Sequence, residues 1–241
     1  MTNKMYLLIN SNKPKDLNTS DSLYFRRLKK MENKKLEILV VEDTIENMKV
    51  AQNYFNQKKD IAVDYATDYN QAIKKIKNKK YNGLITDLFM PEKKGAERDF
   101  FLLKDLFGKI YNKIYQDFEE EIAKGEGASD YKLNYCYELK DYIFSKKGNA
   151  PFGLLIAEKA EEMGIPYVIA TSLFHHNHLA EPVNYYGYNC LKNFSVHKGC
   201  IVTGDKGENV KLKQEYWEEA YAKLNEKINE RRSKENGKRK F

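Results

Sequence analysis

From Leu36 onward, short apolar runs alternate with stretches in which apolar residues recur at helical intervals. A short apolar run between polar residues is typical of a buried strand, whereas apolar positions three and four residues apart are typical of an amphipathic helix. We therefore expect strands that end at Val41, Tyr65 and Asp87, with a helix after each of the first two. Strands and helices in alternation predict a parallel sheet with helices on both faces.

The alternation stops after Pro91 and resumes at Pro151. Within this interval, apolar residues recur on one face of a single long predicted helix. These residues are Leu103, Phe107, Ile110, Ile114, Phe118 and Ile122. A second helix is expected over 130–145, after a turn that contains two glycines. The pattern therefore predicts a helical hairpin, residues 93–150, inserted directly after the strand that ends at Asp87.

Beyond Pro151 the pattern predicts a helix to Met163 and a strand that ends at Thr171. A fifth strand is expected near 188–192, then a small β-hairpin over 199–212 and a last helix from about Lys213 to Arg231. The fold class is α/β, a doubly wound parallel five-stranded sheet in a domain spanning 36–231. We expect residues 1–35 to be a flexible N-terminal extension and residues 232–241 a basic C-terminal tail.

Polar residues stand where three of these strands end. Glu42 and Asp43 follow the first strand, Asp87 ends the third, and Thr171 ends the fourth. Ligands bind at the carboxyl ends of the strands in open parallel sheets, so these side chains meet if the strands are neighbours. Carboxylates suit a hard cation such as Mg²⁺. The sequence thus predicts an acidic magnesium site with a single aspartate nucleophile.

Two segments carry a family likeness. Residues 38–47 and 87–91 resemble the response-regulator receiver domains of two-component signalling, and the interval between Asp43 and Asp87 is close to the one in that family. The resemblance implies the strand order 2-1-3-4-5. It also implies that Asp87 accepts a phosphoryl group from a histidine kinase or phosphotransfer protein. Mg²⁺ would then be held by Glu42, Asp43, Asp87 and the backbone carbonyl of Phe89.

The same resemblance assigns two further residues. Thr171 would occupy the hydroxyl position that hydrogen-bonds the phosphoryl oxygens. Lys192 would be the site lysine, since residues 190–194 resemble the strand-Lys-Pro-Phe ending of the family, with Asn193 in place of the proline. Lys206, in a Gly-rich turn, is the second candidate for this lysine.

The composition limits the kinds of binding partner and the compartment that we expect for this protein. The chain has 42 Lys and Arg against 35 Asp and Glu, a net charge of +7, but the basic residues are dispersed outside the C-terminal cluster. Dispersed charge favours a solvated surface and makes nucleic acid an unlikely partner. Three cysteines without C-x-x-C spacing suit a reducing compartment, and no apolar run has the length of a membrane span. We expect a cytoplasmic protein without membrane insertion.

Two functional interpretations remain. The first is a response regulator receiver that passes a phosphoryl signal to an unknown downstream protein. An external substrate is not expected, because Phe89 stands where phosphatases of the haloacid-dehalogenase type need a second aspartate. The alternative is a receiver-like scaffold that is not phosphorylated and uses the helical insertion to bind a partner protein.

Overall fold

In the computed structural model, four strands form a parallel sheet in the order β2-β1-β3-β4. They are β1 (Leu36–Val41), β2 (Ile61–Ala66), β3 (Gly83–Thr86) and β4 (Tyr167–Thr171). A three-residue strand, β5 (Ile201–Thr203), pairs in parallel with the outer side of β4. The structure describes residues 35–95, 99–125, 130–144, 149–171, 179–191, 201–203 and 210–238, which fall within the unit Leu36–Phe241 apart from Lys35. The order of the first four strands confirms the prediction.

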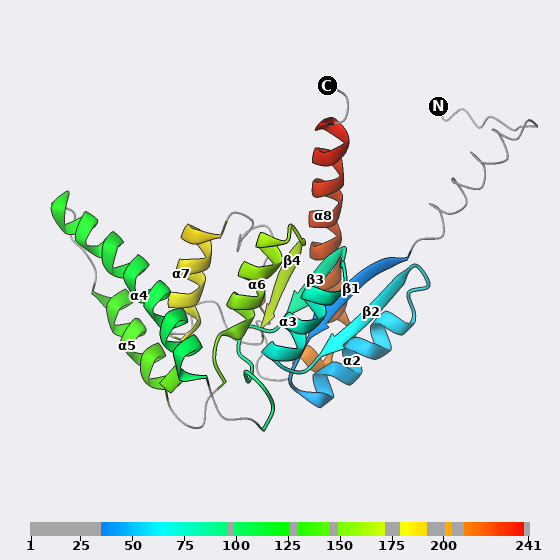
Figure 1. Ribbon diagram of the computed structural model, residues 1–241, viewed down its shortest axis with the longest axis horizontal. Coiled ribbons are helices and arrows are strands. Elements are labelled where there is room, and N and C mark those ends of the chain that lie inside the picture. Colours follow the sequence, from blue (N-terminus) through cyan, green and yellow to red (C-terminus); the bar gives the residue numbers. More distant parts are fainter. Residues whose placement is uncertain are drawn as a thin grey trace, which may run out of the picture. The chain divides into compact units, whose positions relative to one another are not determined.

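Helices cover both faces of this sheet (Figure 1). One face carries α2 (Ile45–Asn56) and α8 (Gln214–Lys238), and the other carries α3 (Tyr69–Asn78) and α6 (Phe152–Glu162). Successive strand residues point to opposite faces, so Val40 packs towards α2 and α8 while Leu39 packs towards α3 and α6. Both faces are apolar, as expected for a parallel sheet buried between helices.

The segment after β3 forms the predicted extra helical region. It contains α4 (Phe100–Ala123) and α5 (Tyr131–Phe144), which pack on each other and on α7 (Ala180–Cys190). The buried stripe of α4 joins the same core as α3 and α6. Lys109 of α4 also pairs with Glu158 of α6 at 3.1 Å, and Tyr186 of α7 donates its hydroxyl to Glu158 at 2.8 Å. The insertion is therefore packed into the domain.

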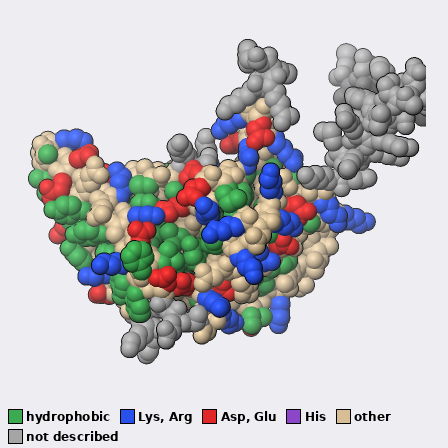
Figure 2. All heavy atoms as spheres, in the orientation of Figure 1, with side chains coloured by type: hydrophobic (Ala, Val, Ile, Leu, Met, Phe, Trp, Pro, Cys, Tyr) green, Lys and Arg blue, Asp and Glu red, His purple; other side chains and the backbone are tan. Residues whose placement is uncertain are grey.

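The outer surface of the insertion keeps many apolar side chains exposed. Figure 2 shows several of them over the part of the surface formed by α4 and α5. The exposed large apolar residues of these two helices are Phe100, Phe101, Tyr115, Ile122, Tyr131 and Tyr137. Ile122, which the periodic pattern placed inward, is exposed near the end of α4.

The predicted fifth strand near 188–192 is wrong as far as the structure describes it, because α7 occupies these residues up to Cys190. The buried residues Ala180, Val183, Asn184 and Gly187 lie three and four positions apart, which is helical spacing. The likeness of residues 190–194 to a strand-Lys-Pro-Phe ending favoured a strand, but the burial pattern of residues 180–187 is that of a helix. Lys192 lies outside the described residues.

The predicted β-hairpin over 199–212 is also wrong for its two described segments. β5 pairs in parallel with β4, and Val210–Leu212 forms a short 3₁₀ helix, η1, directly before α8. Val210 enters the core under α8, and Lys211 turns inward. The last helix continues to Lys238, past the predicted end at Arg231. Arg231 forms an ion pair with Glu235, one helical turn further along α8.

Among the residues that the structure describes, no helix combines the length and apolar character needed to cross a membrane. The predicted N-terminal extension lies outside the described residues.

Candidate functional site

Three acidic side chains meet at the carboxyl ends of β1 and β3. Glu42 and Asp43 directly follow β1, and Asp87 directly follows β3, where its N–H donates to Val41 O at 2.9 Å and extends the strand pairing. Carboxylate oxygens from all three residues lie within 4.8 Å of one another. The predicted convergence of Glu42, Asp43 and Asp87 is thereby confirmed.

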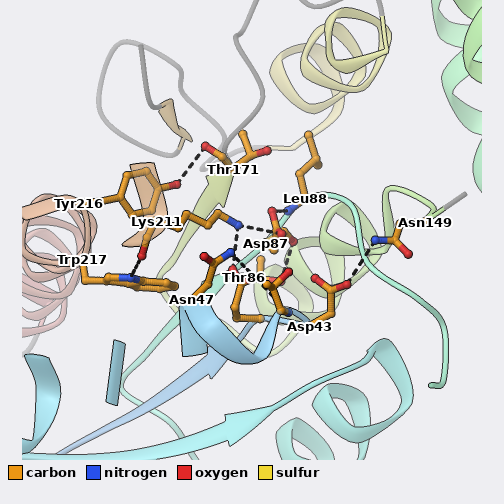
Figure 3. Close-up of polar contacts among 12 residues, drawn as sticks. Asp43, Asn47, Thr86, Asp87, Leu88, Asn149, Thr171, Lys211, Tyr216 and Trp217 are labelled. Atoms are coloured by element: carbon orange, nitrogen blue, oxygen red, sulfur yellow. Dashed lines mark hydrogen bonds and ion pairs between the residues drawn. The ribbon is translucent and has the colours of Figure 1, made fainter. Parts of the chain in front are cut away.

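A buried lysine neutralises part of this charge. The ammonium of Lys211 lies 2.7 Å from Asp87 Oδ2 and 2.8 Å from Glu42 Oε2 (Figure 3), and the lysine side chain is 1% exposed. Burial alone would lower the pKa of Lys211, but the neighbouring carboxylates of Asp87 and Glu42 outweigh burial and raise it. Lys211 is therefore a cation in the folded protein.

Sequence reasoning missed Lys211 and chose Lys192, with Lys206 as the second candidate. Both of those lysines lie outside the described residues, so their roles stay predictions. Lys211 stands between Val210 and Leu212, immediately before the last amphipathic helix. This alternation of apolar and polar residues favours a strand in sequence and does not mark Lys211 as a site residue.

The other oxygen of Glu42 is also occupied. Glu42 Oε1 accepts hydrogen bonds from Asn47 Nδ2 at 3.1 Å and from the Thr44 N–H at 3.2 Å. Both donors come from the start of α2, which follows the acidic pair directly. Glu42 is thus buried, and both of its oxygens have partners. It holds Lys211 in place and adds negative charge to the cluster.

Asp43 is the more open of the two acids after β1. Its Oδ2 accepts a hydrogen bond from Asn149 Nδ2 at 3.2 Å. Burial and the charge of Glu42 raise the pKa of Asp43, while Lys211 and the Asn149 hydrogen bond oppose this rise. Its partial exposure leaves it accessible to a ligand.

Asp87 is held from two sides. Its Oδ1 accepts the Leu88 N–H at 2.7 Å, and its Oδ2 faces Lys211. Burial raises the pKa of Asp87 to about 7; Glu42 adds to this rise and Lys211 opposes it. Because burial and Glu42 favour the protonated form of Asp87, a cation that binds here would compete with a proton.

A glycine allows α6 to approach Asp87 closely. Gly153, in the first turn of α6, donates its N–H to Leu88 O at 3.0 Å. A Cβ atom at this position would stand 1.9 Å from the backbone oxygen of Asp87. No side chain fits in that space, so only glycine lets the start of α6 pack directly against the backbone of Asp87 and Leu88.

The first turn of α8 supports two more residues at this edge of the sheet. Tyr216 donates its hydroxyl to the Thr171 carbonyl at 3.0 Å, and Trp217 Nε1 donates to the Lys211 carbonyl at 2.9 Å. Thr171 ends β4, the strand beside β3, and is 3% exposed. Adjacent residues of one helix thus hold the backbones of Thr171 and Lys211.

Phe89 points its side chain towards the insertion. Its ring meets that of Tyr142 in α5 edge to face, with centroids 5.7 Å apart. The residue is almost wholly buried. The role predicted for its backbone carbonyl in metal binding stays a prediction.

The donor set suits a hard divalent cation. Three carboxylates meet in one place, and Mg²⁺ prefers oxygen ligands, usually one or two carboxylates with several waters. Asp43 and Asp87 are the acids best placed to serve, since both are partly exposed whereas Glu42 is buried.

Comparison with protein families agrees with this geometry. Residues 38–100 match the family model of the response regulator receiver domain, and the matched stretch includes all three acids and Phe89. The chain therefore contains a receiver domain of two-component signalling, followed after β3 by an extra helical stretch. Comparisons with curated proteins and with solved structures gave no match.

Proposed function

We propose that this protein is a response regulator receiver that accepts a phosphoryl group on Asp87. The observation that carries the proposal is the meeting of Glu42, Asp43 and Asp87 within 4.8 Å, with Lys211 against Asp87. Phosphoryl transfer needs an oxygen nucleophile in line with the leaving group and positive charge around the transferred group. Asp87 provides the oxygen, and Lys211 provides a cation beside it.

In the proposed reaction, a carboxylate oxygen of Asp87 attacks the phosphorus of a phosphohistidine on a kinase or phosphotransfer protein. The new P–O bond forms as the P–N bond breaks, and the electron pair of that bond stays on the histidine nitrogen. The Thr171 hydroxyl would then hydrogen-bond the phosphoryl oxygens, and Lys211 would pair with their charge. We also infer the architecture of the whole domain: β5 is the fifth strand of the receiver sheet, and the insertion is a helical hairpin.

Magnesium fits this proposal. A bound Mg²⁺ would supply positive charge next to the phosphoryl oxygens. Asp43, Asp87 and the Phe89 carbonyl would hold it, with Glu42 close by. A protein of this kind works in the cytoplasm and catalyses at most its own phosphorylation and dephosphorylation, without an external substrate.

The test uses a small-molecule phosphoryl donor. The full chain is incubated with acetyl phosphate and Mg²⁺, and its intact mass is compared with that of Asp87→Asn. We expect a gain of one phosphoryl group in the parent alone, and no gain in the parent when EDTA replaces Mg²⁺. An unmodified parent, or equal modification of both proteins, would refute the proposal.

The lysine assignment has its own comparison. Lys211→Met and Lys192→Met are phosphorylated under the same conditions, and the rates are measured. We expect the Lys211 variant to be the slower one because Lys211 contacts Asp87. A slow Lys192 variant beside a normal Lys211 variant would restore Lys192 as the site lysine.

A second candidate function is a scaffold that binds a partner protein through the insertion. The six exposed apolar side chains of α4 and α5 favour it, because exposed apolar surface commonly marks interaction sites. Partner binding that is lost in Phe101→Ser but unchanged in Asp87→Asn would support a scaffold. Binding that follows phosphorylation of Asp87 would support the switch.

A further inference from the structure

The insertion rejoins the sheet beside the acid cluster. Met90 and Ala150 exchange two backbone hydrogen bonds, 3.0 Å from Met90 N to Ala150 O and 3.1 Å from Ala150 N to Met90 O. Gly153 then bonds to Leu88, as described above. We call the Met90–Ala150 pair the clasp. It holds the segment that returns from the insertion next to the segment that leaves Asp87.

Asn149 directly precedes the clasp and reaches into the site. Its side-chain Nδ2 donates to Asp43 Oδ2 at 3.2 Å, although the two residues are 106 positions apart in sequence. Figure 3 shows Asn149 and Lys211 on opposite sides of the acid cluster. The receiver-family match ends at residue 100, so Asn149 belongs to the part of the chain beyond it.

The contact restricts how Asp43 can turn. Asp43 stands close to the carboxylates of Glu42 and Asp87, and their like charges favour rotation of its side chain away from them. The hydrogen bond from Asn149 holds Oδ2 in one place and so fixes the orientation of the Asp43 carboxylate beside the other two acids. Groups that orient metal ligands in this way commonly change metal affinity by about 10–100-fold.

We propose that Asn149 is a positioning residue of the divalent-cation site, through which the insertion controls how tightly the cation binds. Asn149 holds Asp43 in the orientation that receives the cation. Because linkage is reciprocal, a cation that fixes Asp43 also stabilises Asn149 and the clasp. This inference rests on the magnesium site of the proposed function.

The test measures binding of Mg²⁺ to the full, unphosphorylated chain by calorimetry, so that no activity is needed. The proteins compared are the parent, Asn149→Ala, Asp87→Asn, and the control Asn112→Ala, whose residue is exposed on α4. We expect Asn149→Ala to bind Mg²⁺ about tenfold more weakly than the parent. Asn112→Ala should bind as the parent does, and the melting temperatures without metal should agree.

A second measurement, on the parent alone, does not depend on how any variant folds. Amide hydrogen exchange of Ala150 is followed with and without Mg²⁺, and we expect Mg²⁺ to slow it. Unchanged exchange at Ala150 in the presence of bound Mg²⁺ would overturn the coupling to the clasp.

The two levels of inference fail in different ways. Parent-like affinity in Asn149→Ala, with binding lost in Asp87→Asn, overturns the role of Asn149 and leaves the proposed function standing. A parent that binds no Mg²⁺, or that binds it as well as Asp87→Asn does, removes the metal site itself and both inferences with it.

Discussion

The ammonium of Lys211 lies 2.7 Å from Asp87 Oδ2, and it also contacts Glu42. A buried charge is tolerated when it is paired, and removal of one partner leaves the other uncompensated. Lys211 thus allows the buried Glu42 to stand beside the partly buried Asp87. The same contact places a cation against the side chain that we propose as the phosphoryl acceptor.

Lys211→Met should lower the free energy of unfolding by about 3–5 kcal/mol in EDTA, because it leaves the buried Glu42 and the partly buried Asp87 without their cation. Urea unfolding measures this loss, and Mg²⁺ should restore part of it. The matched control is Lys223→Met, which removes a surface pair with Glu219 on α8 and should cost about 0–1 kcal/mol. Equal losses in the two variants would contradict a buried role for Lys211.

Gly153→Ala should destabilise the fold by at least about 2 kcal/mol, because its Cβ would collide with the backbone of Asp87 and Leu88. Gly108→Ala in α4 is the control, since a Cβ there meets nothing within 4 Å. Alanine in a helix interior is favoured over glycine by about 0.5–1 kcal/mol, so this variant should gain stability. Thermal unfolding of both variants checks the prediction, since the melting temperature should fall in Gly153→Ala and rise in Gly108→Ala.

A third prediction concerns acid. The Tyr81 hydroxyl, 2.7 Å from Asp64 Oδ2, lowers the pKa of Asp64, and Lys79 adds to this effect. A carboxyl group whose pKa is lowered in the folded protein stabilises the fold at pH values above its pKa in the unfolded chain, 3.8. This stabilisation is lost as the pH falls through the pKa of the folded state. Tyr81→Phe should therefore cost more stability at pH 7 than at about pH 3. Urea unfolding at both pH values measures the difference, and a larger cost in acid would be the wrong sign.

The insertion should contribute to global stability. Ile110 of α4 is 0% exposed and lies in the core shared with α6, so Ile110→Ala should cost about 2–5 kcal/mol. Ile122 of the same helix is 52% exposed, and Ile122→Ala should change stability by less than about 1 kcal/mol. Denaturant unfolding compares the two. Similar small effects would mean that α4 unfolds apart from the sheet.

The acid cluster could be predicted because strand ends are visible in sequence. An apolar run that stops at Glu42 or at Asp87 marks both the strand and the edge at which it ends. The helices of the insertion were predictable for a similar reason, since their apolar residues recur locally. In both cases, the signal lies within a few residues of the feature that it predicts.

Lys211 and Asn149 could not be recognised in this way. Lys211 meets Glu42 across 169 positions, and Asn149 meets Asp43 across 106. Each lies outside the periodic pattern, and its role depends on where β1 and β3 place their acids. The error at α7 has a different cause: the likeness of residues 190–194 to a strand-Lys-Pro-Phe ending placed a strand near 188–192, whereas α7 continues to Cys190.

The clasp between Met90 and Ala150 has a consequence for how this chain can vary. Because the two ends of the insertion are already joined, its length is decoupled from the position of Asp87. Doubling the length of a closed loop costs only about 0.6 kcal/mol in chain entropy. Segments of other lengths can therefore be accommodated beyond the clasp while Glu42, Asp43 and Asp87 keep their positions at the edge of the sheet.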